Sequence, residues 1–214
     1  MKNLLKIATV FFLFCIHTMT AQEMKYYIEE NGKLLPTTKI TFEKSIDHSK
    51  NVDVYLENDN GQIGVLYIRR RDGKLDAEQM KELKTFLKTQ SGMSVNDNEY
   101  IGIHYLSAQP ETDINEGGKY GYLERKAQRK LLKIVPSKYF HIYATGGRNG
   151  KITAKDKEVL TKDENRFIHK IFFPVEMNYG NVVVVRPDGT YKVYLGEYNP
   201  DEIYKMAEAL KAMP

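Results

Sequence analysis

One polar stretch of the sequence holds several side chains that could take part in chemistry. The apolar run YIGIHYL at 100–106 is followed by SAQPETDINEGG, which carries Ser107, Glu111 and Asp113. Loops that follow the carboxyl ends of parallel strands are a common place for ligands in α/β proteins. We therefore predict that this loop, 107–118, helps to bind a ligand through Ser107, Glu111 and Asp113.

His104, Ser107 and Asp113 are also the residue types of a hydrolytic triad. Residues three apart in an extended run point to opposite faces, so His104 and Ser107 do not meet along the strand. The sequence also lacks the Gly-x-Ser-x-Gly turn that exposes a nucleophilic serine. A strand histidine beside an ordinary loop serine is therefore the favoured interpretation.

Two histidines, His104 and His141, lie in separate predicted strands, EYIGIHYL and KYFHIYAT. If these strands are neighbours, the two imidazoles could bind a metal ion with Glu111 or Asp113 as a third ligand. No His-x-His or His-x-x-x-His spacing supports such a site. Hydrogen-bonded strand histidines are the favoured interpretation, with the metal site as the alternative, and no cofactor is predicted.

A second loop, ATGGRNGKIT at 144–153, has the outline of a phosphate-binding loop because it ends in Gly-Lys. The Walker pattern needs Gly at 145 and Ser or Thr at 152, where the sequence has Thr145 and Ile152. The glycines of this loop favour a flexible connection instead. Anion contact through Arg148 and Lys151 is the binding role that stays open for it.

Residues 1–21 have the composition of a Sec-type signal peptide. The basic start MKNLLK precedes the apolar run IATVFFLFCI, and Ala21 offers a small residue at the cut. The single cysteine of the sequence, Cys15, falls in this segment, and the bulky Phe14 before it argues against a lipoprotein. We expect an exported protein, periplasmic or extracellular, without disulfides, thiolate catalysis or Cys-bound metal.

The charges of the sequence are close to balanced, with 32 Lys and Arg against 28 Asp and Glu. This balance predicts no nucleic-acid partner, and no later run approaches the ~18 apolar residues of a transmembrane helix. A predicted helix at 120–135 carries a basic side that, with Arg69–Arg71, could contact an anionic surface weakly. A solvated helix face is the favoured interpretation of these residues, which include Arg125, Lys126, Arg129, Lys130 and Lys133.

The elements that would position these residues fall into two parts. For residues 22–62, the sequence predicts an N-terminal β extension. It contains a hairpin in KYYIEENGKLLP, a strand in KITFEK, which alternates with a period of two, and two strands around Asn58–Gly61.

In residues 63–214, predicted strands alternate with predicted helices. Asp76 with Gln79 and Thr161 with Glu164 have the spacing of capping boxes, and Pro200 follows the predicted cap Asn199. The strand from 64 to 71 opens the series, and each β-α-β crossover predicts a parallel pair. The last two strands, joined across Pro187–Gly189, predict an antiparallel edge, with helices covering both faces of the sheet.

This element order resembles the thioredoxin-like fold. The closest local match, NVVVVRPDGTYKVYLGEYNPDEIYKMAEAL at 181–210, is similar to the closing β-β-α of thioredoxin- and peroxiredoxin-type domains. Redox members carry one or two cysteines where this sequence has LSAQPETDINEGG, and a proline before the penultimate strand where it has MNYGN. The resemblance implies an α/β, thioredoxin-like β-α-β-α-β-α-β-β-α sandwich with an N-terminal β-hairpin extension, as a divergent member that lacks redox chemistry.

We therefore expect a non-redox binding or interaction module whose partner is an unknown small ligand or an envelope protein. One alternative is a cysteine-independent enzyme that uses His104, His141 and the loop carboxylates, with or without a metal ion. The other alternative is a structural envelope protein whose tyrosine-rich N-terminal strands pair with a partner edge.

Overall fold

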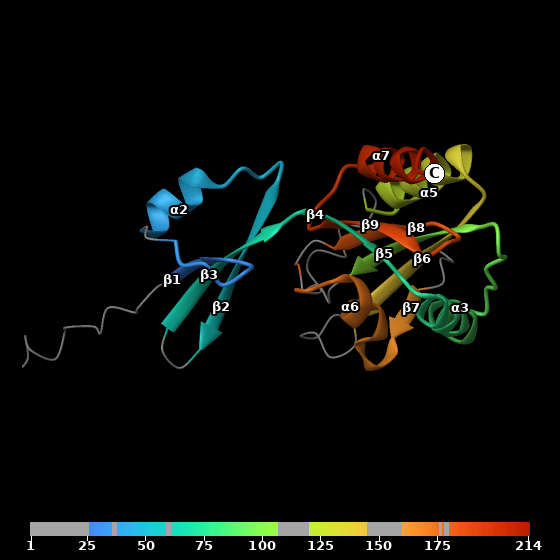
Figure 1. Cartoon of the computed structure of the whole chain (residues 1–214), viewed down its shortest axis with the longest axis horizontal. Helices are drawn as coiled ribbons and strands as arrows, with labels where there is room; N and C mark the ends of the chain where they lie inside the picture. Colours follow the sequence, from blue (N-terminus) through green and yellow to red (C-terminus); the bar gives the residue numbers. More distant parts are fainter. Residues whose placement is uncertain are drawn as a thin grey trace, which may run out of the picture. The chain divides into compact units, whose positions relative to one another are not determined.

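The chain divides into two units in the computed structural model, Met1–Ile46 with Asp53–Tyr67, and Asp47–Val52 with Ile68–Pro214 (Figure 1). The structure describes residues 26–35, 38–58, 61–106, 120–144, 160–175, 177 and 180–214. The expected signal peptide, 1–21, lies outside these residues. The predicted boundary at residue 62 falls inside a strand of the first unit.

The first unit contains a three-stranded sheet in the order β1-β3-β2, with β1 parallel to β3. The elements are β1 (Tyr26–Glu29), α2 (Lys39–Ser45), β2 (Asn51–Asn58) and β3 (Gly61–Ile68). Tyr27 and Phe42 are buried with their ring centroids 4.5 Å apart, and they join the helix to the sheet. The predicted hairpin after β1 is present as a bridge between Ile28 and Leu34.

The segment KITFEK is a helix, so the prediction of a strand there was wrong. Thr38 caps α2, because its hydroxyl accepts a hydrogen bond from the backbone N–H of Thr41 at 3.3 Å. The side chain of Phe42 is buried on the inner side of this helix. Six alternating residues are too few to distinguish the helical period from the strand period, and the packing of Phe42 against Tyr27 decides the outcome.

The second unit is built on a six-stranded mixed sheet in the order β4-β9-β8-β5-β6-β7. Its central strands β5 and β6 are parallel, and β7 extends them in parallel, whereas β4, β9, β8 and β5 pair antiparallel. The strands are β4 (Arg70–Lys74), β5 (Tyr100–Leu106), β6 (Ser137–Ala144), β7 (Leu160–Asp163), β8 (Asn181–Val185) and β9 (Thr190–Leu195). The chain is therefore of the general α/β class.

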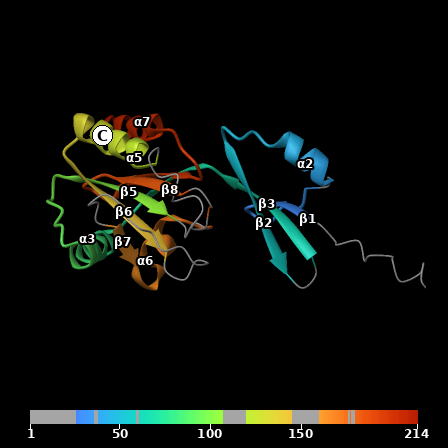
Figure 2. The ribbon, with the colours of Figure 1, turned by 180° about the vertical axis from the view of Figure 1, so that it is seen from behind.

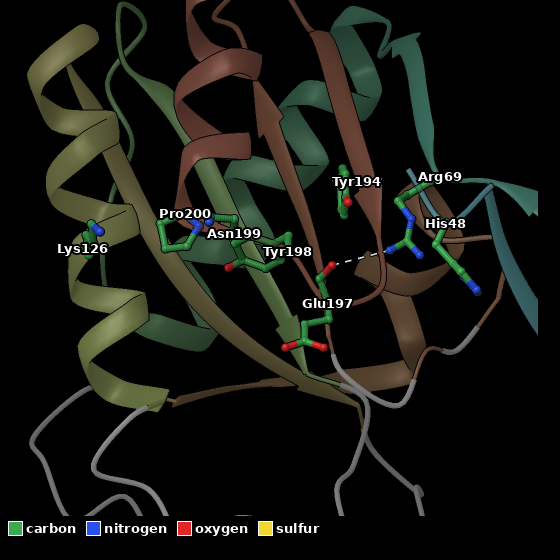
Figure 3. A pocket seen from close by; sticks show the side chains of 8 residues that line it. All are labelled: His48, Arg69, Lys126, Tyr194, Glu197, Tyr198, Asn199 and Pro200. Atoms are coloured by element: carbon green, nitrogen blue, oxygen red, sulfur yellow. Dashed lines mark hydrogen bonds between the residues drawn. The ribbon is translucent and has the colours of Figure 1, made fainter. Parts of the chain in front are cut away.

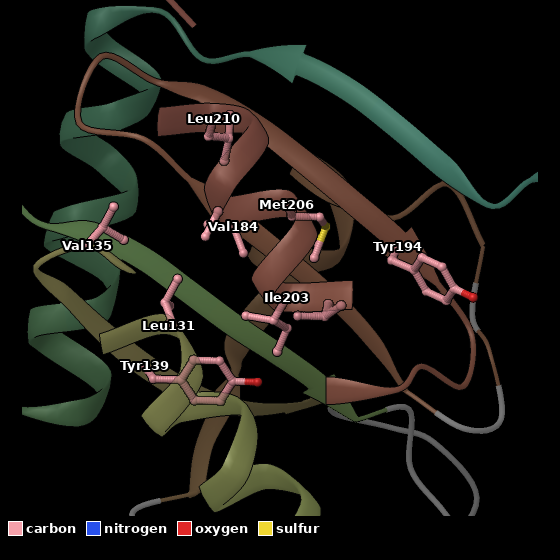
Figure 4. Close-up of a cluster of buried hydrophobic side chains, with 10 residues drawn as sticks. Leu131, Val135, Tyr139, Val184, Tyr194, Ile203, Met206 and Leu210 are labelled. Carbon is pink, nitrogen blue, oxygen red and sulfur yellow. The ribbon is translucent and has the colours of Figure 1, made fainter. Parts of the chain in front are cut away.

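Helices cover both faces of this sheet, as expected. Helices α5 (Tyr120–Ile134) and α7 (Pro200–Lys211) lie on one face, and α3 (Ala77–Ser91) and α6 (Phe167–Phe172) on the other (Figures 1 and 2). A cluster of buried side chains fills the space between the sheet and α5 and α7 (Figure 4). Its members are Leu131, Val135, Tyr139, Val182, Val184, Tyr194, Ile203, Met206, Ala207 and Leu210. Among the helices of the described residues, none is both long and apolar enough to span a membrane.

Several predicted helix ends are confirmed. Asp76 and Gln79 form a complete capping box, and Gly92 ends α3 in the left-handed conformation with φ of 74°. Asn199 caps α7, with Pro200 in its first turn. These signals depend only on neighbouring residues, which is why the sequence reveals them.

The predicted pairing of the outer strands was wrong. The run 64–71 is interrupted at Arg69, and β4 after it pairs antiparallel with β9 instead of parallel with β5. Strand β4 therefore takes the edge that was expected for the 181–195 hairpin, and β8 lies in the centre of the sheet. Every residue of β8, NVVVV, is buried, which is typical of a central strand.

The second predicted capping box, Thr161 with Glu164, was also wrong. Thr161 lies in β7, and a 3-10 turn, η1 (Glu164–Arg166), comes before α6. The buried carboxylate of Asp163 accepts hydrogen bonds from the backbone N–H groups of Ile168 at 2.9 Å and His169 at 3.1 Å. Asp163 thus takes the capping role at α6 from inside the core.

Candidate functional site

A row of side chains crosses the six-stranded sheet on the face covered by α5 and α7. Residues paired across neighbouring strands point to the same side of a sheet. The strand pairing aligns His141 with His104, His104 with Val182, Val182 with Tyr194 and Tyr194 with Arg70. Two histidines at one end of the row are therefore joined through Val182 to a tyrosine and an arginine at the other.

The two histidines form an aromatic group with two tyrosines. The imidazole centroids of His104 and His141 are 5.8 Å apart, and these residues are 2% and 7% exposed. Tyr198 meets His104 edge-on at 5.5 Å, and Tyr139 meets His141 at 5.2 Å. The hydroxyls of Tyr139 and Tyr198 are 3.3 Å apart, which closes the group.

A pocket of about 520 Å³ opens beside Tyr198 (Figure 3). Its floor is the end of β9 and the connection to α7, and Lys126 of α5 forms one wall. Arg69 and His48 form the opposite wall (Figure 3). Apart from Pro200, the lining side chains are polar, aromatic or charged: His48, Arg69, Lys126, Tyr194, Glu197, Tyr198 and Asn199. All of them belong to the second unit.

Arg69 is the most constrained member of the pocket. It is 8% exposed, and Nη1 donates hydrogen bonds to the carbonyl oxygens of Leu195 at 2.9 Å and Glu197 at 3.5 Å. Nε donates to the carbonyl of Asn51 at 3.3 Å, and the guanidinium carbon lies 5.3 Å from the ring centre of Tyr194. These contacts hold the guanidinium in one orientation before any ligand arrives.

A glycine next to Arg69 makes this geometry possible. Gly196 has φ of +80°, a conformation that residues with a side chain rarely adopt. A Cβ atom at this position would lie 3.1 Å from Nη1 of Arg69. The backbone N–H of Gly196 donates a hydrogen bond to the side-chain oxygen of the buried Asn181 at 2.8 Å, which fixes the turn after β9.

Arg69 and Arg70 differ in charge compensation. Nη2 of Arg70 donates to Glu202 Oε2 at 2.8 Å, and Lys205 donates to the same carboxylate at 2.7 Å. Burial raises the pKa of Glu202, but the hydrogen bonds from Lys205 and Arg70 outweigh it and hold that pKa below its usual value. Within the described residues, Arg69 has no carboxylate partner, and its Nη2 donates no hydrogen bond.

The structure places some of the predicted site residues and not others. His104 and His141 lie directly opposite each other on β5 and β6. In the described part of the chain, no three potential ligands come together as a metal site, and the metal-binding role of this pair stays a prediction. The proposed loop ligands lie outside the described residues: Ser107, Glu111, Asp113, Arg148 and Lys151.

The predicted basic surface is only partly present. Arg129 and Lys133 are exposed on α5, and the side chain of Arg125 lies outside the described ones. Arg69 is buried, so its expected contribution to an exposed basic patch was wrong, whereas Arg70 is exposed but paired with Glu202. The bend at Arg69 turns its side chain toward the end of β9.

Sequence reasoning missed the pocket because its walls come from distant segments. His48, Lys126 and the 194–200 segment meet only in the folded chain. One local signal was available: GEYNP places a glycine, a tyrosine and a helix cap in a row after a strand. The sequence matches no protein-family model, and a search of curated proteins finds no match.

The pocket offers fixed hydrogen-bond donors and aromatic walls to a polar ligand, and no cysteine lines it.

Proposed function

We propose that this chain is an exported, non-redox binding module of thioredoxin-like type, and that the pocket beside Tyr198 and Arg69 is its ligand site. The export signal at 1–21 and the periplasmic or extracellular location belong to the same proposal.

The strand arrangement supports the thioredoxin-like part of the proposal. Strands β5 and β6 are parallel neighbours joined by α5, β8 lies antiparallel beside β5, and α7 follows the β8–β9 hairpin. A thioredoxin-like core has two parallel strands, a closing hairpin and a final helix in this relation. Strands β4 and β7 are additions at the two edges.

The observation that carries the binding role is the preorganised pocket. Its volume of about 520 Å³ lies in the range of about 300–1,000 Å³ that is usual for small-molecule sites. Backbone hydrogen bonds and helix caps hold its walls, since Arg69 is bound to the end of β9 and Asn199 caps α7. A pocket whose donors are already oriented loses little conformational entropy when it binds.

Nuclear magnetic resonance of the purified chain tests the proposal. A set of small polar probes would include glucose, glycine, acetate and phosphate. We expect at least one probe to shift the backbone amide signals of Glu197, Tyr198 and Asn199 in a saturable way. Tyr198→Ala should abolish this effect, whereas Tyr204→Ala should preserve it because Tyr204 is exposed on α7. The proposal is wrong if no probe moves the pocket signals.

One observation supports the enzyme alternative, namely the buried histidine pair at 5.8 Å. A metal ion held by His104 and His141 would have to draw further ligands from the chain. Elemental analysis of the purified protein tests this idea. Stoichiometric zinc or iron that is lost in His104→Ala would support it, and a metal content unaffected by this substitution would exclude the pair as ligands.

A further inference from the structure

We infer that the pocket takes an oxyanion, that is, a small molecule with a carboxylate, phosphate or sulfate group, and that Arg69 and Lys126 recognise this group. The inference rests on the proposed binding function and names the chemical class of the ligand. It draws on the charges around the pocket, which the binding proposal does not use.

The first observation is the uncompensated charge of Arg69. A buried guanidinium is costly unless hydrogen bonds and an opposite charge surround it. Backbone carbonyls occupy Nε and Nη1, yet no carboxylate of the described residues lies within ion-pair distance. The unused N–H groups of Nη2 belong to a side chain that lines the pocket. An oxyanion would supply both the missing acceptor and the missing charge.

Arg70 provides an internal comparison for this argument. Its guanidinium carbon lies 5.0 Å from the ring centre of Tyr194, about as close as that of Arg69. Glu202 neutralises it at 2.8 Å, so Arg70 has its counter-ion within the fold. Two neighbouring arginines thus contact one tyrosine, and the one that lines the pocket is the one without a carboxylate partner among the described residues.

The second observation is Lys126 on the facing wall. Its side chain is exposed, and it forms no ion pair with any residue that the structure describes. Lys130, one turn further along α5, is instead paired with Asp201. Lys126 therefore adds an exposed positive charge across the pocket from the buried one of Arg69, an arrangement that suits an anionic group between them.

Glu197 opposes this attraction, so the inference predicts stronger anion binding when its charge is removed and weaker binding when that of Lys126 is removed. Its side chain is exposed and lines the same pocket, while its carbonyl oxygen binds Arg69 (Figure 3). A carboxylate here repels an oxyanion, so the affinity should rise when this charge is removed. The pocket volume also exceeds that of a bare phosphate ion, which leaves room for an organic group beside Tyr198.

Titrations of the purified chain with phenyl phosphate and benzoate, followed by the amide signals of 196–199, test the inference. Benzyl alcohol serves as the neutral probe of similar shape. We expect both anions to bind and benzyl alcohol to bind more weakly. Lys126→Gln should weaken the anions by about threefold to fivefold, and Glu197→Gln should strengthen them by a similar factor, the size expected for exposed charge pairs.

Matched controls separate local recognition from net charge. Lys170→Gln on α6 and Glu82→Gln on α3 change the net charge equally but lie on the other face of the sheet. They should leave both affinities unchanged, and equal effects of Lys126→Gln and Lys170→Gln would overturn the inference. Arg69→Lys keeps the charge but loses the planar guanidinium with its several N–H donors, so it should weaken anion binding more than Lys126→Gln does if the variant folds.

The outcomes also distinguish this inference from the proposed function. If benzyl alcohol shifts the pocket signals as strongly as the anions do, the pocket binds ligands but the oxyanion inference is wrong. If none of the three probes nor the earlier set of polar probes shifts them, the binding function itself is wrong. Binding of anions that is insensitive to Lys126 and Glu197 would place the anion site elsewhere and overturn the inference.

Discussion

The two faces of the six-stranded sheet bury polar groups in different ways. On the face of α3 and α6, the fully buried Asp163 accepts hydrogen bonds from the hydroxyl of Tyr105 at 3.0 Å and from the N–H groups of Ile168 and His169. On the face of α5 and α7, the buried Arg69 donates its hydrogen bonds to backbone carbonyls, has no carboxylate partner among the described residues and lines an open pocket. A buried charge whose partners are internal stabilises the fold, whereas one with unused donors at a pocket is a candidate for ligand binding.

The largest expected effect concerns the internal face. Asp163→Ala removes the acceptor of the hydroxyl of Tyr105 and of the N–H groups of Ile168 and His169, and each buried donor left without a partner costs about 1–3 kcal/mol. We expect the free energy of unfolding to fall by about 3 kcal/mol or more, as measured by urea denaturation.

Two further variants make this first prediction decisive. Glu164→Ala is the control, because this neighbouring carboxylate is exposed and, among the described residues, pairs with Lys162 alone, so the loss should be small. Tyr105→Phe removes one donor and leaves Asp163 the N–H groups of Ile168 and His169, which gives a milder variant if Asp163→Ala does not fold. Equal stability of Asp163→Ala and the parent protein would contradict the stabilising role assigned to Asp163 on the face of α3 and α6.

The next effect concerns Glu202 on the pocket face. Glu202→Gln removes the charged partner of Arg70 and Lys205, and we expect a loss of about 1.5–3 kcal/mol near neutral pH. The folded protein holds the pKa of Glu202 below its usual value, so the unfolded chain binds the proton more readily. The stabilisation is therefore present above the unfolded pKa and is lost as the pH falls through the folded one.

Denaturation at pH 7 and pH 3 measures this dependence. The difference in stability between the parent protein and Glu202→Gln should be large at pH 7 and should shrink at pH 3. A difference that is the same at both pH values would contradict the assigned pKa direction. It would also remove the contrast between Arg70, which Glu202 neutralises, and Arg69, which has no carboxylate partner among the described residues.

The smallest effect is expected for the hydroxyl of Tyr198. Its contact with the hydroxyl of Tyr139 at 3.3 Å is long, and the residue lines the pocket. We expect Tyr198→Phe to cost about 0.5 kcal/mol, at the low end for a hydrogen bond, and less than Tyr105→Phe, whose hydroxyl binds a buried carboxylate. Thermal or urea denaturation of the two variants side by side tests which of them loses more stability. A larger loss in Tyr198→Phe than in Tyr105→Phe would contradict the proposed difference between the two faces.

Features that depend on neighbouring residues were predictable from the sequence. The capping box of Asp76 and Gln79 and the Asn199–Pro200 start of α7 were expected and are present. The strands that carry His104 and His141 were expected to be neighbours, since a strand-helix-strand run favours a parallel pair, and they are paired residue for residue. For the caps a few adjacent residues contain the whole signal, and for the strand pair the order of consecutive elements is sufficient.

Features that depend on distant contacts were not predictable in the same way. KITFEK became a helix because of the Thr38 cap and the packing of Phe42, and Asp163 displaced the expected cap at Thr161. Strand β4 lies beside β9 because the bend at Arg69 changes the course of the chain. A short pattern is compatible with several local structures, and contacts outside the pattern select one of them, whether they come from nearby residues such as Thr38 and Asp163 or from a distant strand such as β9.

By itself, the sequence determined the α/β class, the main helix caps and the pairing of the two histidine strands, since periodicity and capping are local properties. Only the tertiary structure decided which of two adjacent arginines is neutralised and which lines a pocket. That choice depends on Glu202 on one helix, on carbonyls at the end of β9, and on Gly196, which leaves space for the guanidinium. A charge acquires its role from the groups that the fold places around it, and these lie more than 100 residues away along the chain.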